Sequence, residues 1–296
     1  MRTQSLTRGS ILTSLISFAV PVLLALLLQA AYGAADLIIV GRFAGTLEQS
    51  GVASGSQLFN TVTMVITGLT MGVTVFVGNA IGAGKRTLAG KAIGTGIVIF
   101  AVVAILVTAF TAPSSRVLAS MLHAPEEAFS QTSDYIRICG MGTVFIVAYN
   151  VIGAVFRGIG DSRTPLLTVA IACVINIVGD LVLVAGFGMG AAGAAIATVG
   201  AQAVSVLCSL LLIRRRPLPF SFSLSSCLRP DGVCVRGILR VGTPIALQEL
   251  LVQFSFLFIQ VIVNGMGVTS LFKISSDGLN SVGFTKHGWL RRWPCR

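Results

Sequence analysis

LISFAVPVLLALLLQAAYGAADLIIV, residues 15–40, is a run of apolar and small residues interrupted near its end by one carboxylate, Asp36. About 20 such residues are enough for an α-helix to cross the hydrocarbon core of a membrane. A second acid, Asp180, lies inside another apolar run at 165–186. A carboxylate at membrane depth costs at least about 2.5 kcal/mol on insertion scales, so we interpret both acids as candidate ion or proton sites. The alternative is a neutral acid that a neighbouring side chain satisfies.

The composition of the whole chain predicts its fold class. Hydrophobic residues make up 54% of the 296 positions and charged residues 10%, compared with roughly 45–50% and 25% in soluble domains. Barrel-like alternation is absent, and an open sheet could not satisfy its backbone in lipid. We therefore expect an all-α integral membrane protein, with seven spans at about 15–40, 52–78, 91–112, 136–156, 165–186, 191–213 and 238–264.

The distribution of lysine and arginine predicts the topology. The N-terminus and the loops after the second, fourth (Arg157, Arg163) and sixth spans hold most of the cations, whereas the opposite loops hold little beyond Arg42 and Arg116. The positive-inside rule then places the N-terminus in the cytoplasm, in a plasma or bacterial inner membrane. The net charge of +11 is mostly this topology signal. No nucleic-acid partner is expected, because the cations are scattered among loops.

This topology predicts a common depth for four polar side chains. Asp36 and Asp180 lie five and six residues before the outer ends of their spans, about 8–9 Å at 1.5 Å per residue. Asn176 lies one turn before Asp180 on the same helix face, and Thr198 returns to a similar depth on the next span. These oxygens suit a hard cation such as Na⁺, and two close acids equally suit a proton. Interhelical hydrogen bonding is the alternative for Asn176 and Thr198.

Two glycine-rich loops have simpler interpretations. GAGK at 82–85 is a turn rather than a phosphate-binding loop, because Arg86 follows the lysine where that motif needs Ser or Thr. In GIGDSRTP at 158–165, either Asp161 or Ser162 can cap the helix that Pro165 opens, with Arg163 at the cytoplasmic interface.

Four segments, in order along the chain, resemble the multidrug and toxic compound extrusion (MATE) transporters: GNAIGAGK at 78–85, FRGIGDSRTP at 156–165, INIVGD at 175–180 and GAAIATVGAQ at 193–202. The resemblance covers about residues 10–270. It implies a fold of two six-helix lobes and exchange of organic cations for Na⁺ or H⁺. Matched motif to motif, the family's N-lobe cation site corresponds to Asp36, Asn176, Asp180 and Thr198. Glu249 matches an acid of the C-lobe site described in some members.

The resemblance also predicts the domain organisation. We expect a six-helix N-lobe at 1–213, a cytoplasmic linker at 214–236 and a seventh span at 237–270 that begins a second lobe. Span seven resembles span one when the two are aligned on Pro21 and Pro244. Residues 271–296 are polar and basic with no apolar span, and on the outer face they would contradict the positive-inside bias. We therefore expect a truncated or frame-shifted chain with an aberrant tail, which would not transport on its own.

Three functions remain open at this stage. The first is a cation-coupled antiporter that exports organic cations or drugs, present as an incomplete chain. The second is an inactive membrane fragment. The third is a lipid or oligosaccharide flippase of related architecture, whose headgroup would need a cationic cavity where we expect acidic charges. An enzyme is disfavoured because HExxH and GxSxG motifs are absent. Organic cations and membrane lipids are the expected partners, with no cofactor and no metal other than Na⁺.

Overall fold

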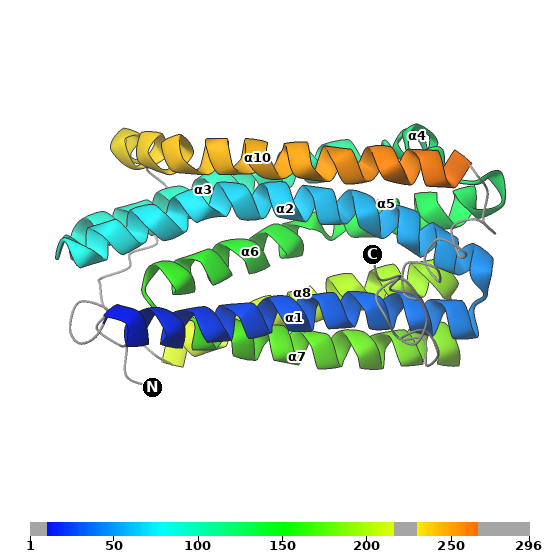
Figure 1. Cartoon of the computed structure of the whole chain (residues 1–296), viewed down its shortest axis with the longest axis horizontal. Helices are drawn as coiled ribbons and strands as arrows, with labels where there is room; N and C mark the ends of the chain where they lie inside the picture. The colour runs from blue at the N-terminus through cyan, green and yellow to red at the C-terminus, as the bar shows by residue number, and fades with distance from the viewer. Residues whose placement is uncertain (1–10, 216–229, 266–296) are drawn as a thin grey trace, which may run out of the picture.

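A computed structural model of the chain describes residues 11–215 and 230–265. Within these ranges every regular element is helical, and Figure 1 shows the long helices lying side by side along one axis. The predicted tail at 271–296 and most of the predicted linker lie outside the described residues, so these domain assignments stay predictions. The elements are α1 (Ile11–Phe43), α2 (Thr46–Gly82), α3 (Arg86–Thr111), α4 (Ser115–Met121), η1 (Glu126–Ala128), α5 (Phe129–Met141), α6 (Thr143–Gly158), α7 (Arg163–Asp180), η2 (Leu181–Gly186), α8 (Gly190–Arg215) and α10 (Gly232–Gly265).

The helices confirm the predicted fold class and show that one predicted span is bent. Among the described residues, five helices are long and apolar enough to cross a membrane: α1, α2, α3, α7 with η2, and α8. Residues 126–141 and 143–158 make a sixth if they count as one span bent by 54°. The span predicted at 136–156 therefore falls on two helices with a bend between them rather than on one straight helix. The seventh predicted span is a helix, α10, and its membrane crossing stays a prediction.

The break between α5 and α6 has a packing cause at Gly142. The side chain of Val199, on α8, occupies the space where a Cβ of residue 142 would lie. Glycine leaves that space free, so α8 packs into the bend. Sharp kinks often form at glycine, but the hydropathy pattern of 136–156 gives no sign of the partner that fills the gap.

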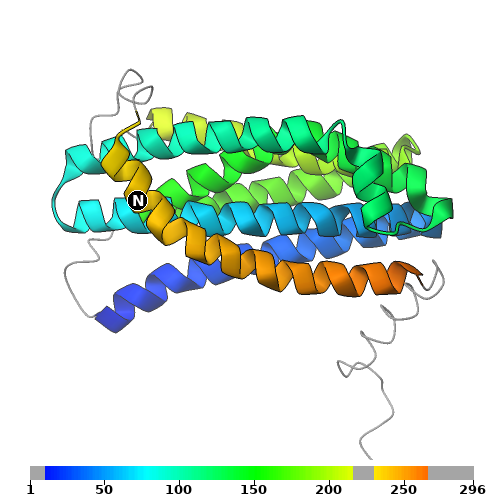
Figure 2. The same ribbon diagram turned by 90° about the horizontal axis from the view of Figure 1, so that it is seen from above.

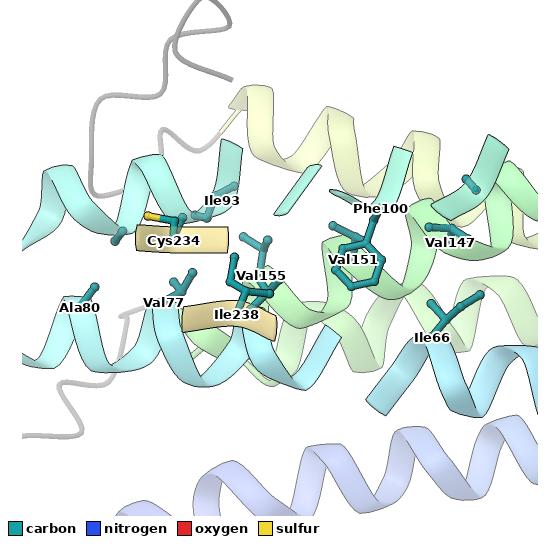
Figure 3. Packing of buried hydrophobic residues seen from close by; sticks show 14 residues of the cluster. Ile66, Val77, Ala80, Ile93, Phe100, Val147, Val151, Val155, Cys234 and Ile238 are labelled. Atoms are coloured by element: carbon teal, nitrogen blue, oxygen red, sulfur yellow. The ribbon is translucent and has the colours of Figure 1, made fainter. Parts of the chain in front are cut away.

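Two buried clusters hold the bundle together. Figure 3 shows the first, where Ile66 of α2, Phe100 of α3, Val151 of α6 and Ile238 of α10 pack together. The second joins α1, α2, α4, α5, α6, η2 and α8, and Val40 is fully buried within it. Many leucine and phenylalanine side chains of α1 and α10 are exposed, as expected for helix surfaces that meet lipid.

Helix α10 packs closely along α2 (Figures 1 and 2). A Cβ at Gly68 of α2 would lie 2.7 Å from the Cα of Ala246, and a Cβ at Gly242 would lie 2.5 Å from the carbonyl oxygen of Leu69. Small residues at these positions let the two backbones approach, which is how membrane helices gain packing energy. The helix that we predict to begin a second lobe thus packs against α2.

The loop before α7 answers the question that the sequence left open. The backbone N–H groups of Arg163 and Thr164 donate to Asp161 Oδ1 at 3.0 and 3.1 Å, whereas Ser162 makes no side-chain capping bond. Asp161 is therefore the capping residue. The helix begins at Arg163, two residues before Pro165, because the Asp161 carboxylate already satisfies the first free amides.

The first turn of α10 is capped in a similar way. Asp231 Oδ1 accepts a hydrogen bond of 2.9 Å from the Val233 N–H, and the Asp231 N–H donates to Thr95 Oγ1 at 3.2 Å. The Val233 amide is the main cause of a lowered pKa at Asp231. Lys91 Nζ lies 3.5 Å from Asp231 Oδ2, an exposed ion pair that contributes little. The cap attaches α10 to α3.

We expect Asp231→Ala to lower the melting temperature of the purified protein at neutral pH, and Asp231→Asn to lower it less because asparagine also caps helices. Since folding lowers the pKa of Asp231 from its ordinary value of 3.8, the stabilisation is present above that value and is lost as the pH falls through the lowered pKa. The difference between wild type and Asp231→Ala should therefore shrink below about pH 4. A difference independent of pH would contradict this assignment.

A second carboxylate joins the N-terminal ends of α2 and α8. Glu48, in the first turn of α2, accepts a hydrogen bond of 2.7 Å through Oε2 from the Ala191 N–H. Gly190 has a φ of +54°, and its missing Cβ leaves room for the Glu48 carboxylate. A negative group at a helix N-terminus satisfies a free amide and interacts favourably with the helix dipole.

Removing this contact should loosen α8 from α2. Losing a helix cap costs about 0.5–2 kcal/mol, so we expect Glu48→Ala to lower the melting temperature by about 1–8 °C. Glu48→Gln keeps an acceptor oxygen and should fall between wild type and the alanine variant. Thermal unfolding of the three purified proteins in detergent tests the assignment. Equal melting temperatures for all three would show that the contact carries no stability.

Candidate functional site

The two membrane-depth acids meet between α1 and α7. Asp36 lies seven residues before the end of α1 and is 6% exposed, and Asp180, the last residue of α7, is fully buried. The two carboxylates lie close enough to interact electrostatically. Asp180 also stands where α7 passes into the π-helical turn η2. Such turns are rare and occur frequently at functional sites.

Asn176 and Thr198 join the same region through one hydrogen bond. Asn176 Nδ2 donates to Thr198 Oγ1 at 3.3 Å, from α7 to α8. Gly179 permits this contact, since a Cβ there would lie 2.9 Å from the Cβ of Ala197. The structure therefore brings Asn176 and Thr198 to one level, as the helical rise predicts. The hydrogen bond uses the donor of Asn176 and leaves its carbonyl oxygen free.

Four buried oxygens at this site have no hydrogen-bond donor among the residues that the structure describes. They are Asp36 Oδ1, Asn176 Oδ1 and both carboxylate oxygens of Asp180. A buried polar atom without a partner is rare in folded proteins and normally marks a bound group or a functional role. Oxygen atoms from carboxylates and an amide match the chemistry of a hard cation, and two interacting carboxylates can share a proton. The residues present therefore fit the predicted ion site.

Asp36 and Thr198 also line a cavity of about 520 Å³ inside the bundle, whereas Asn176 and Asp180 do not. The two acids thus differ in access, since only Asp36 faces the cavity. Gln29 Nε2 donates to the Tyr149 hydroxyl at 3.0 Å across it, and Tyr135 interacts with Thr198. Further polar groups on the cavity wall are Tyr32, Gln57, Asn60, Asn150 and Gln202.

Sequence reasoning missed most of this polar wall. Gln29 and Tyr32 precede Asp36 by seven and four residues, and Gln202 follows Thr198 by four. This spacing places each of them on the same helix face as a predicted site residue, so the sequence did contain a signal for them.

Arg157 gave no such signal in the sequence. The charge distribution predicts a cytoplasmic loop for it, but it lies in the last turn of α6 and lines the cavity. The cavity therefore carries both signs of charge, which corrects the expectation that its charges are acidic.

Glu249 lies apart from the other predicted site residues. It is a half-buried residue of α10 and does not line the cavity that contains Asp36. Gln253, one turn further on, is buried, and its Oε1 lies 3.5 Å from Asn60 Nδ2 on the cavity wall. The assignment of Glu249 to a second-lobe ion site stays a prediction.

Comparison with known proteins gives a consistent family. The chain is 29% identical over 270 residues to "Probable multidrug resistance protein YpnP" of Bacillus subtilis, covering 90% of this chain and 59% of that protein. It is 25% identical over 288 residues to "Multidrug export protein MepA" of Staphylococcus saprophyticus, covering 92% and 60%. The chain therefore spans about 60% of the length of these relatives.

A solved structure has the same fold. It is a MOP superfamily transporter from Pyrococcus furiosus, whose description reads "reverse polarity of binding pocket suggests different function". The TM-score is 0.83 at 24% sequence identity, over 96% of this chain and 63% of that one. The similarity between this chain and that structure is therefore a similarity of fold.

The family assignment rests on more than half of the sequence. The MatE family model matches residues 21–182, which include α2 to α6, Asp36, Asn176 and Asp180. The recognised region therefore holds both membrane-depth acids and the glycine-rich loops, and the chain belongs to the MatE family of multi-pass membrane transporters.

Proposed function

We propose that this chain serves in the export of organic cations, driven by entry of Na⁺ or H⁺. The coupling ion would bind Asp36, Asn176, Asp180 and Thr198, and the organic cation would occupy the adjoining cavity. The observation that carries the proposal is the set of four buried oxygens without donors at two interacting carboxylates. The names of the relatives, multidrug resistance and export proteins, support the transport class.

The geometry supplies a reason for exchange rather than co-transport. Asp36 lines the cavity and would also be a ligand of the proposed ion site. A single carboxylate cannot fully neutralise an inorganic cation and an organic cation at once, so occupation of one position lowers the affinity of the other. By linkage this antagonism is reciprocal. Asp180, buried behind Asp36, would retain the ion while the organic cation approaches from the cavity.

The other interpretations make different demands. An inactive fragment would need no ion affinity. A lipid or oligosaccharide flippase would need a cationic cavity, and among the residues that line the cavity only Arg157 favours that function. The absence of HExxH and GxSxG motifs in the sequence still argues against an enzyme, and the transport proposed here needs no cofactor. Ion binding therefore separates the leading proposal from the fragment.

We expect the purified chain to bind ²²Na⁺, or to take up protons in its place, at a site that Asp36→Asn and Asp180→Asn abolish. The reason is that each substitution removes a charge that the cation needs while keeping the side-chain volume. Asp134→Asn is the matched control, because Asp134 is exposed on α5. Scintillation proximity measures Na⁺ binding, and a pH indicator in weak buffer measures proton uptake. If neither cation binds the wild type, or if the Asp36 variant binds as wild type, the proposed ion site is wrong.

The proposed orientation places the N-terminus in the cytoplasm. In a background with native cysteines replaced by serine, Arg116→Cys should react with a membrane-impermeant maleimide from outside intact cells, and Ala83→Cys should react only after lysis. Both positions are exposed. Ala83 lies just before α3 begins and Arg116 lies just beyond its other end, so the two positions flank opposite ends of this helix. Gel-shift labelling of the two variants tests the assignment, and the reverse pattern would overturn it.

A further inference from the structure

Arg157 points into the protein rather than toward a membrane surface. It lies in the last turn of α6 and lines the cavity. Its Nη1 atom lies 3.3 Å from the position that a Cβ of Gly153 would take, so the guanidinium folds back along its own helix, one turn toward Tyr149. Tyr149 also interacts with it electrostatically. Glycine at 153 provides the space for this conformation.

The guanidinium has no charged partner among the residues that the structure describes. The ion pair found there joins Lys91 to Asp231, and no hydrogen bond of the Arg157 side chain occurs in the same part of the chain. An arginine has five N–H donors in a fixed planar arrangement, and arginines away from bulk water are almost always paired. Ser162, a buried residue on the same cavity wall, adds a hydroxyl. These donors suit a planar anion such as a carboxylate.

Arg157 and Asp36 lie toward opposite ends of the cavity. Helices α1 and α6 run antiparallel (Figure 1), and the Gln29–Tyr149 hydrogen bond sets their relative level. Asp36 lies seven residues beyond Gln29 in one direction, and the guanidinium lies near Gly153, four residues beyond Tyr149 in the other. At 1.5 Å per residue the two charges are about 16 Å apart along the bundle.

We infer that the cavity binds a zwitterion, with its cationic end at Asp36 and its carboxylate at Arg157. Allowing about 3 Å for the contact at each end, the charges of the ligand would be on the order of 10 Å apart. This inference rests on the proposed function, since the cationic end uses the carboxylate proposed for exchange. It adds an anion subsite and a length to the substrate class.

The test uses two ligands that differ in one charge. Rhodamine 6G, a fluorescent organic cation with no free carboxylate, is bound to the purified full chain and followed by fluorescence polarisation. It is then displaced by 8-aminooctanoate, or by the methyl ester of 8-aminooctanoate. We expect the acid to displace the dye at about tenfold lower concentration than the ester, because a carboxylate–guanidinium pair is a strong charge-assisted contact.

Arg157→Gln should reduce this acid-to-ester ratio to about one while the variant still binds rhodamine 6G and the ester, which also shows that the variant is folded. Arg157→Lys should restore part of the ratio. Arg163→Gln is the matched control, because Arg163 is an exposed cation six residues along the chain. An equal ratio in wild type, or a tenfold ratio that survives in Arg157→Gln, would overturn the anion subsite.

Two further outcomes separate the sources of failure. If rhodamine 6G does not bind the wild type, or binds Asp36→Asn equally well, the proposed function fails first. If rhodamine 6G binds as expected but the acid has no advantage, only the zwitterion inference fails. 4-Aminobutanoate and glycerophosphocholine, whose opposite charges lie closer together, should displace the dye poorly. Arg157-dependent displacement by glycerophosphocholine below the concentration needed for 8-aminooctanoate would point to a lipid headgroup and overturn the length argument.

Discussion

The proximity of two buried carboxylates, Asp36 and Asp180, is the constraint on which the site depends. Burial of a charged group is costly unless a partner compensates it, and here each acid has another acid as its neighbour. A bound cation or proton would relieve this cost, and four of the site's oxygens have no hydrogen-bond donor among the described residues. Helix α1 packs on α7 and α7 packs on α8, with Gly179 allowing the approach that brings Thr198 to Asn176.

Much of this arrangement could be predicted from the sequence because helical geometry in a membrane is nearly one-dimensional. Once the spans and their direction are assigned, a rise of 1.5 Å per residue gives every side chain a depth. Asn176 and Thr198 were predicted to share a level on this basis, and they form a hydrogen bond. The fold class can be predicted from less information still, because the composition and the length of the apolar spans suffice.

The features that could not be predicted depend on the direction of a side chain or on a contact distant in sequence. The bend at Gly142 requires Val199, 57 residues away. The direction of Arg157 requires the space at Gly153, whereas an arginine at the end of a span normally reaches for the membrane surface. A positive-inside count treats all such arginines alike, so it assigned Arg157 to the loop and left the cavity with acids alone.

Asp36 connects the proposed ion site with the cavity. In the proposed function Asp36 would belong both to the ion site and to the cavity wall, so whatever enters the cavity would compete with the coupling ion for one carboxylate. Arg157 cannot take part in that competition, since it lies on the order of 16 Å away along the bundle. It can therefore favour ligands by their anionic end without affecting the exchange itself. Selectivity and coupling would then depend on separate residues, which lets one vary while the other is kept.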